Sequence, residues 1–146
     1  MSRILSQILK DKLPDWNEVV FNEAISYEVC AASGVSVIEA DVKSQGEYVI
    51  HDGYPVIILK KRITPQMRLW VLLHELGHHL LHYPDAHWFS KSKCMKIDRE
   101  SNFFAAIAMM PTWLVKSKTP SEIARDFDYP EEIIEIRREI TVNFRI

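Results

Sequence analysis

The stretch LWVLLHELGHHLLHYPDAH, residues 69–87, holds five of the six histidines of the chain. Within it, His74, Glu75 and His78 form an H-E-x-x-H pattern. Residues four apart in a helix lie on one face with Cβ atoms about 5–6 Å apart, so two imidazoles at this spacing can bind one metal ion. Glu75 flanks that face and can accept a proton from a water that the metal activates. The pattern predicts a catalytic zinc site on a helix.

The residues around this pattern help to separate a metal site from a buried helix that carries incidental histidines. H-E-x-x-H alone is only moderately specific. The preceding residues, MRLWVLL at 67–73, are almost wholly apolar and predict a buried helix, in which imidazole and carboxylate groups need partners. Gly77 costs a helix interior about 1 kcal/mol relative to alanine, which predicts that another segment of backbone approaches closely there. Both features favour the metal site.

A catalytic zinc ion takes three protein ligands and keeps one position open, so a third ligand is needed. The extended pattern H-E-x-x-H-x-x-G-x-x-H is excluded, because Leu81 and Pro84 replace its glycine and last histidine. His82 lies one turn further along the same helix, and we expect it to support a ligand or the structure rather than bind the ion. His87 stays open as a ligand from a loop, and His79 is expected to be exposed.

Two carboxylates in IDRESNFFAAIAMM, residues 97–110, compete for the third position. Glu100 lies on the apolar face of this helical pattern, where a carboxylate is unfavourable unless it has a partner such as a metal ion. Asp98 projects from a different side, where the favourable effect of a negative charge near a helix N-terminus explains it. The predicted metal ligands are His74, His78 and Glu100, with Glu75 as the general base and His82 and Asp98 as residues that hold ligands in place.

The elements that must position these residues are a small sheet and a set of helices. Apolar periodicity and capping residues predict helices at 2–10, 15–34, 64–83 and 97–110, a loop at 82–96, and a helical pair around 128–130. Strands are predicted at 35–40, 47–51 and 56–60, the last two joined by a hairpin at Asp52-Gly53. We expect an α+β fold with a small antiparallel sheet. The whole chain, 1–146, is interpreted as one domain with N-terminal helices (1–34), a sheet (35–60), zinc-site helices (61–111) and a C-terminal helical pair (112–146).

The bulk composition is that of an ordinary globular protein. The 146 residues are 47% hydrophobic and 26% charged, which is enough for a sizeable core. A net charge of −2 gives no electrostatic basis for binding nucleic acid or an anionic membrane. The two cysteines have no C-x-x-C spacing, and neither a signal peptide nor a membrane span is present in the sequence. These features predict a cytoplasmic protein.

Residues 119–140, TPSEIARDFDYPEEIIEIRREI, have the pattern of a helix-turn-helix. A recognition helix that faces phosphates should be basic. The second helix instead carries four glutamates against two arginines. DNA binding is therefore disfavoured, and most of these residues are expected to form core and a solvated face.

Taken together, two segments resemble the ImmA/IrrE family of zinc metallopeptidases. RLWVLLHELGHHLLH, residues 68–82, matches the family pattern HELGH-x-x-x-H, and DRESNFFAAIAMMP, residues 98–111, is similar to E-A-N-x-F-A-x-x-L-L-M-P. Ser101 replaces the usual alanine, and IAMMP replaces a leucine-rich form. The paired motifs are far more specific than either alone. The resemblance implies a minimal zincin-like fold, zinc bound by His74, His78 and Glu100, and Glu75 as the catalytic residue.

The leading hypothesis is a zinc-dependent endopeptidase that makes a site-specific cut in a protein partner. The resemblance implies that this partner is a helix-turn-helix repressor of a phage or other mobile element. We expect the substrate to add as a strand along the hairpin near Val56–Lys60, and Tyr54, Tyr83 and Tyr129 are candidate hydrogen-bond donors to the transition state. The alternatives are a metal-binding regulatory or interaction module without general proteolysis, and a DNA-binding regulator. An intact Glu75 favours the peptidase.

Overall fold

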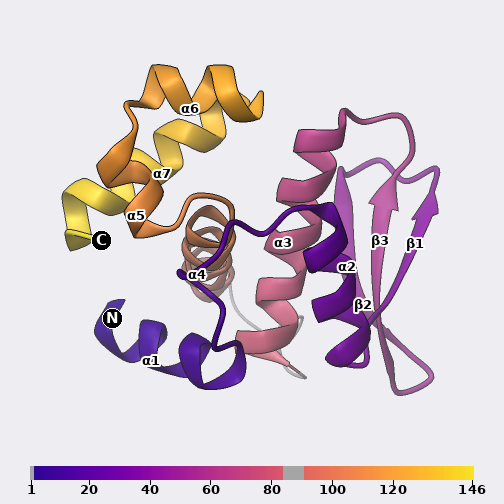
Figure 1. Ribbon diagram of the computed structural model, residues 1–146. Helices are drawn as coiled ribbons and strands as arrows, with labels where there is room; N and C mark the ends of the chain where they lie inside the picture. Colours follow the sequence, from indigo (N-terminus) through magenta and orange to yellow (C-terminus); the bar gives the residue numbers. More distant parts are fainter. Residues whose placement is uncertain (1, 84–90) are drawn as a thin grey trace.

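The computed structural model describes residues 2–83 and 91–146, in which a small sheet forms one edge of the molecule and helices form the rest (Figure 1). The helices are α1 (Ser2–Lys12), α2 (Glu23–Ala32), α3 (Pro65–His82), α4 (Lys91–Met109), α5 (Thr112–Ser117), α6 (Pro120–Phe127) and α7 (Glu131–Phe144). The strands are β1 (Ser36–Ala40), β2 (Gly46–His51) and β3 (Tyr54–Lys60). The expected α+β architecture is confirmed.

The sheet is mixed, which corrects the expectation of a purely antiparallel one. Its strand order is β1-β3-β2, with β1 parallel and β2 antiparallel to β3. The backbone N–H of Lys60 donates to Gln45 O at 2.9 Å. The N–H of Lys61 donates to Ala40 O at 3.2 Å. The connection 41–45 therefore crosses the end of β3, and β1 and β2 lie on the two sides of β3.

The hairpin between β2 and β3 is confirmed. Its two turn residues, Asp52 and Gly53, both have positive φ, of 49° and 83°. Two successive positive φ values are typical of a type I′ turn, whose twist matches that of the flanking strands. The turn fixes the register in which His51 pairs with Tyr54 and Tyr48 pairs with Ile57.

Helix α3 lies between the sheet and α4 and forms the centre of the molecule (Figure 1). It begins as predicted, with Thr64 at the N-cap and Pro65 in the first turn, where the missing N–H of proline costs no hydrogen bond. Leu72, Leu73 and Leu76 are fully buried. Within residues 2–83 and 91–146, no helix combines the length and apolar character needed to cross a membrane.

The helix predicted at 15–34 is shorter than expected. Asn17 has φ of 64°, a left-handed conformation that interrupts a right-handed helix, and its side chain accepts a hydrogen bond from Thr112 N at 2.7 Å. Helix α2 begins only after Asn22, whose side chain accepts from Ile25 N at 2.9 Å. Its end is close to the prediction, because Gly34 follows with φ of 75°.

Helix α4 begins earlier than expected. Residues 91–96 belong to it, although they were predicted to form part of a loop. Their polar composition gives little helical periodicity in the sequence. Pro84, the predicted end of α3, and His87 lie outside the described residues.

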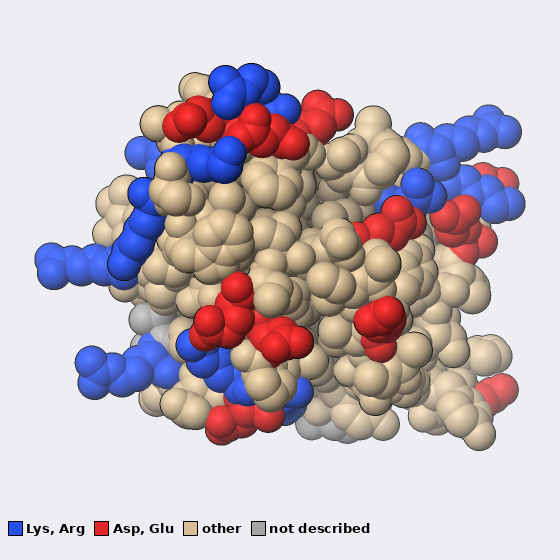
Figure 2. Space-filling view, viewed as in Figure 1, with Lys and Arg blue, Asp and Glu red and all other residues tan. Residues whose placement is uncertain are grey.

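The C-terminal helices pack on α4 rather than standing apart. The buried Arg137 of α7 donates from Nε to Met110 O at 2.6 Å, and Tyr129 donates to Met109 O at 3.2 Å. The predicted helical pair is confirmed as α6 and α7, and the short α5 was not predicted. On the face in Figure 2, acidic and basic side chains alternate near α6, consistent with the ion pair between Arg125 and Asp126 at 3.0 Å.

Candidate metal centre

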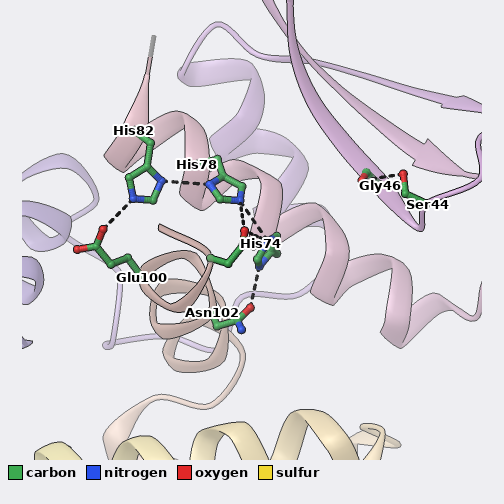
Figure 3. A network of polar contacts seen from close by, with 8 residues as sticks. Ser44, Gly46, His74, His78, His82, Glu100 and Asn102 are labelled. Atoms are coloured by element: carbon green, nitrogen blue, oxygen red, sulfur yellow. Dashed lines mark hydrogen bonds and ion pairs between the residues drawn. The ribbon is translucent and has the colours of Figure 1, made fainter. Parts of the chain in front are cut away.

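Helix α3 carries a row of three histidines that faces α4. His74, His78 and His82 are four residues apart and follow one another along the helix (Figure 3). Their ring centroids are separated by 4.8 Å for the first pair and 5.2 Å for the second. Burial lowers the pKa of all three imidazoles. Each ring is therefore neutral near neutral pH, the form in which a histidine binds a metal.

The close backbone approach expected at Gly77 is confirmed. A Cβ placed on Gly77 would lie 3.1 Å from Ser101 Cα and 3.2 Å from Phe104 Cδ2, both on α4. Only glycine allows α3 and α4 to pack at this distance without a shift. The contact brings the polar residues of α4 on either side of Ser101 within reach of the histidine row.

Asp98 of α4 completes a cluster with the first two histidines. Its Oδ1 lies 3.0 Å from His78 Nε2 and 3.5 Å from His74 Nε2. The two Nε2 atoms are 3.2 Å apart. Among the described residues, His74, His78 and Asp98 are a group whose ligand atoms all lie within 4.8 Å of one another.

The proton positions make this cluster suitable for a cation. Asn102 Oδ1 lies 2.7 Å from His74 Nδ1, and because a carbonyl oxygen only accepts, Nδ1 carries the proton and Nε2 keeps its lone pair. That lone pair faces Asp98 and the ring of His78. A tetrahedral zinc ion with bonds of about 2.0–2.2 Å separates its ligand atoms by about 3.3–3.6 Å. The observed separations of 3.0, 3.2 and 3.5 Å are close to these, so the donor set fits zinc.

Glu100, the ligand predicted from the sequence, lies outside this cluster. Its side chain is only 16% exposed, in line with its place on the apolar face, but its Oε1 lies 3.0 Å from His82 Nε2 (Figure 3). The partner that its burial requires is therefore an imidazole. Asp98 and Asn102 are four residues apart and share the helical face toward the histidines. From the sequence, the position of Asp98 was explained only by the favourable effect of a negative charge near a helix N-terminus. The geometry favours Asp98 over Glu100 as the third ligand.

Glu75 has the properties of a base at the edge of this cluster. Burial, with smaller contributions from the carboxylates of Asp98 and Glu47, raises its pKa to about 7. It lines a cleft of about 260 Å³ next to His74. The other lining residues are Gln45 and Gly46 at the start of β2, Trp70 and Val71 of α3, and Asn102 of α4.

The edge of the sheet that borders this cleft is β2. A Cβ on Gly46 would collide with Val71 Cγ1, so glycine lets β2 approach α3 beside Glu75. The expectation that a substrate adds along Val56–Lys60 is wrong, because β3 pairs with a strand on each side and has no free edge. β2 is a terminal strand of the sheet order, and its outer edge is unpaired among the described strands.

His79 is half-buried, which corrects the expectation that it is exposed. Its Nδ1 lies 2.7 Å from Tyr48 OH and its Nε2 lies 3.2 Å from Ser33 O. It therefore ties α3 to β2 and to the end of α2. Two of the tyrosines considered as donors are placed elsewhere: Tyr54 is 72% exposed at the hairpin, and Tyr129 OH is used by the contact with α4.

Asn102 is the functional residue that the sequence analysis did not single out. It appears in the family motif, and a further signal was available, because it lies four residues after Asp98 and so shares its helical face. Its contact with His74 can be recognised only from the packing of α4 against α3.

Comparison with known proteins agrees with this geometry. No curated protein matches the chain. The model of the Peptidase_M78 family, described as the IrrE N-terminal-like domain, matches residues 30–142. These are metallopeptidases, which implies a bound metal ion and a protein or peptide substrate. The match extends over most of the chain, including every residue of the cluster, and the protein therefore belongs to the Peptidase_M78 family.

Proposed function

We propose that this chain is a zinc-dependent endopeptidase in which His74, His78 and Asp98 bind the metal and Glu75 is the general base. The observation that carries the proposal is the convergence of three lone-pair-bearing atoms, separated by 3.0 to 3.5 Å, beside a carboxylate whose pKa is raised to about 7. Asp98 takes the position that the sequence analysis gave to Glu100. A His-His-carboxylate set is one that catalytic zinc sites use.

The residues of the chain divide the chemistry among them. When bound, zinc supplies Lewis acidity toward the carbonyl of the scissile bond and toward water. Glu75 accepts the proton of the attacking water on its carboxylate and then delivers it to the leaving amine nitrogen. Because burial makes the carboxylate more basic, Glu75 accepts a proton more readily than an exposed carboxylate does. Asn102 keeps the ring of His74 oriented by accepting its Nδ1 proton.

The substrate segment binds along the free edge of β2. In an antiparallel pair, alternate residues turn their backbone groups toward the partner strand. Gln45 O bonds to Lys60 N, which places the outward-facing backbone groups at Gly46, Tyr48 and Ile50. An extended peptide added there would pass beside the cleft that contains Glu75.

The partner proposed for cleavage is a helix-turn-helix repressor in the cytoplasm, encoded by a phage or other mobile element. This part rests on the ImmA/IrrE resemblance. Specificity would come from docking of the folded partner in addition to the strand, because the cleft itself is small. The test is incubation of purified protein with the product of a neighbouring repressor gene, with zinc and with a chelator. One zinc-dependent cut supports the repressor, and wild-type function of Glu75→Gln would favour a regulatory module without proteolysis.

The metal site is tested separately from the substrate. Protein prepared without added metal should contain about one equivalent of zinc, as expected for a single three-ligand site. His78→Ala and Asp98→Ala should lose it, while His79→Gln, on the same helix but outside the cluster, should keep it. Glu75→Gln should keep the metal and lose hydrolysis, because an amide cannot accept the proton. If Asp98→Ala keeps zinc and Glu100→Ala has none, Glu100 is the third ligand and the present assignment is wrong.

A further inference from the structure

We propose that His82 and Glu100 form a hydrogen-bonded relay that orients the metal ligand His78, so that both are positioning residues of the site. The inference rests on the proposed function, because it takes His78 Nε2 as the metal-binding atom. The inference assigns roles to His82 of α3 and to the buried Glu100 of α4, neither of which belongs to the metal cluster.

The contacts form an unbranched chain from α4 to the metal-binding atom. Glu100 Oε1 lies 3.0 Å from His82 Nε2, and His82 Nδ1 lies 3.1 Å from His78 Nδ1 (Figure 3). His78 Nε2 is then the atom that faces Asp98. The His82 and Glu100 side chains are only 6% and 16% exposed, so water has little access to compete for either hydrogen bond.

The direction of each hydrogen bond follows from the metal. With zinc on His78 Nε2, the proton of that neutral ring must be on Nδ1. His82 Nδ1 must therefore accept, which places the only proton of the His82 ring on Nε2. Among the described residues, the hydrogen-bond partner of that nitrogen is a carboxylate oxygen of Glu100, which accepts the proton. All three residues are thus in the single arrangement that leaves His78 Nε2 free.

The two histidine ligands are consequently held by different kinds of partner. His74 is oriented by the neutral amide of Asn102, at 2.7 Å. His78 is oriented by an imidazole that is itself bonded to a carboxylate. A carboxylate at the end of such a chain polarises the rings and makes the ligand nitrogen a stronger donor to the metal. The spacing of four residues between His78 and His82 on one helix is what lets the two rings meet.

The experiment measures zinc affinity by competition with a chromogenic chelator, with no need for cleavage. His82→Leu removes the acceptor for His78 and should weaken zinc binding by about 10–100-fold, the usual effect of losing such a partner. Glu100→Leu should weaken it less, because His82 remains. Glu100→Gln should restore most of the loss, since its amide oxygen still accepts from His82. Wild-type affinity in His82→Leu, or no zinc bound by Glu100→Gln, would overturn the relay; the second result identifies Glu100 as a direct ligand.

A spectroscopic readout on the unmodified protein covers the case in which a variant fails to fold. The imidazole nitrogen resonances of the zinc-loaded chain distinguish the two neutral tautomers. The relay requires His82 to be protonated on Nε2 and His78 on Nδ1, and the opposite tautomer at His82 refutes it. If the protein binds zinc in this form but cleaves no substrate, the peptidase proposal fails and the relay stands. If the wild-type chain binds no zinc, both fail.

Discussion

Gly77→Ala is the substitution that most directly tests whether the approach of α3 and α4 sets the metal site. The added methyl would lie 3.1 Å from Ser101 Cα and 3.2 Å from Ser101 Cβ. Backbone atoms of a packed helix cannot rotate away as a long side chain can. The two helices must therefore separate by a few tenths of an ångström, because carbon atoms pack best at about 3.5–4.0 Å.

Two opposing effects determine the stability of this variant. Alanine favours the helix by up to about 1 kcal/mol relative to glycine. Overpacking a close contact costs about 1–3 kcal/mol. We therefore expect the free energy of unfolding of the metal-free protein to fall by up to about 2 kcal/mol, measured by urea denaturation.

The same shift should weaken zinc binding, because Asp98 is on α4 and the two histidine ligands are on α3. A site must be held within about 0.5 Å of its productive geometry, so even a small separation matters. Ser101→Gly removes Ser101 Cβ, one of the three atoms of α4 that the methyl would contact, and should partly restore zinc binding in the double variant. A Gly77→Ala protein that is more stable than wild type and binds zinc equally well would refute the view that this contact sets the site.

Three further results are expected. In the metal-free Glu75→Gln protein, burial holds the folded-state pKa of His74, His78 and His82 below the ordinary value of 6.5. The free energy of unfolding should therefore be fully present above that pH and fall as the pH falls toward the lowered values; the substitution removes Glu75, whose raised pKa acts in the opposite direction. Urea titrations at several pH values measure this, and a flat profile contradicts it. Thr119→Ala removes the hydrogen bond that Thr119 Oγ1 accepts from Glu122 N, one of the two bonds of the capping box of α6, and should cost about 0.5–2 kcal/mol in denaturation; an unchanged midpoint would mean that this hydrogen bond does not stabilise α6. Tyr48→Phe removes the partner of His79 at 2.7 Å and should cost about 0.5–1.5 kcal/mol with zinc affinity unchanged; weaker zinc binding would show that this contact also positions the site.

The features predicted correctly from the sequence are those that local signals determine. Thr64 and Pro65 mark the start of α3, and the Asp52-Gly53 turn fixes a hairpin regardless of what surrounds it. Gly77 in a helix interior predicted a close neighbour, which the structure identifies as Ser101 of α4. In each case the physical cause lies within a few residues of the position concerned.

The features that were missed depend on contacts between distant segments. No local sequence signal near β1 indicates that residues 41–45 cross the end of β3, so the parallel pairing of β1 with β3 was not predicted. Asn17 adopts a left-handed conformation, and its side chain accepts a hydrogen bond from the backbone N–H of Thr112, far along the chain. The choice between Asp98 and Glu100 depends on the same kind of contact, because a metal was taken as the partner of the buried carboxylate and the structure shows that His82 is another.

The position of the proposed ligands on two different helices has a consequence for folding. An ion shared by His78 and Asp98 would join α3 to α4 and close the intervening chain into a loop, as a disulfide does. Because the unfolded chain does not hold these groups together, metal at about one hundred times its dissociation constant would add about 2.7 kcal/mol to stability. A chelator would thus act as a mild denaturant as well as an inhibitor, and the cellular lifetime of this protein would follow the supply of its metal.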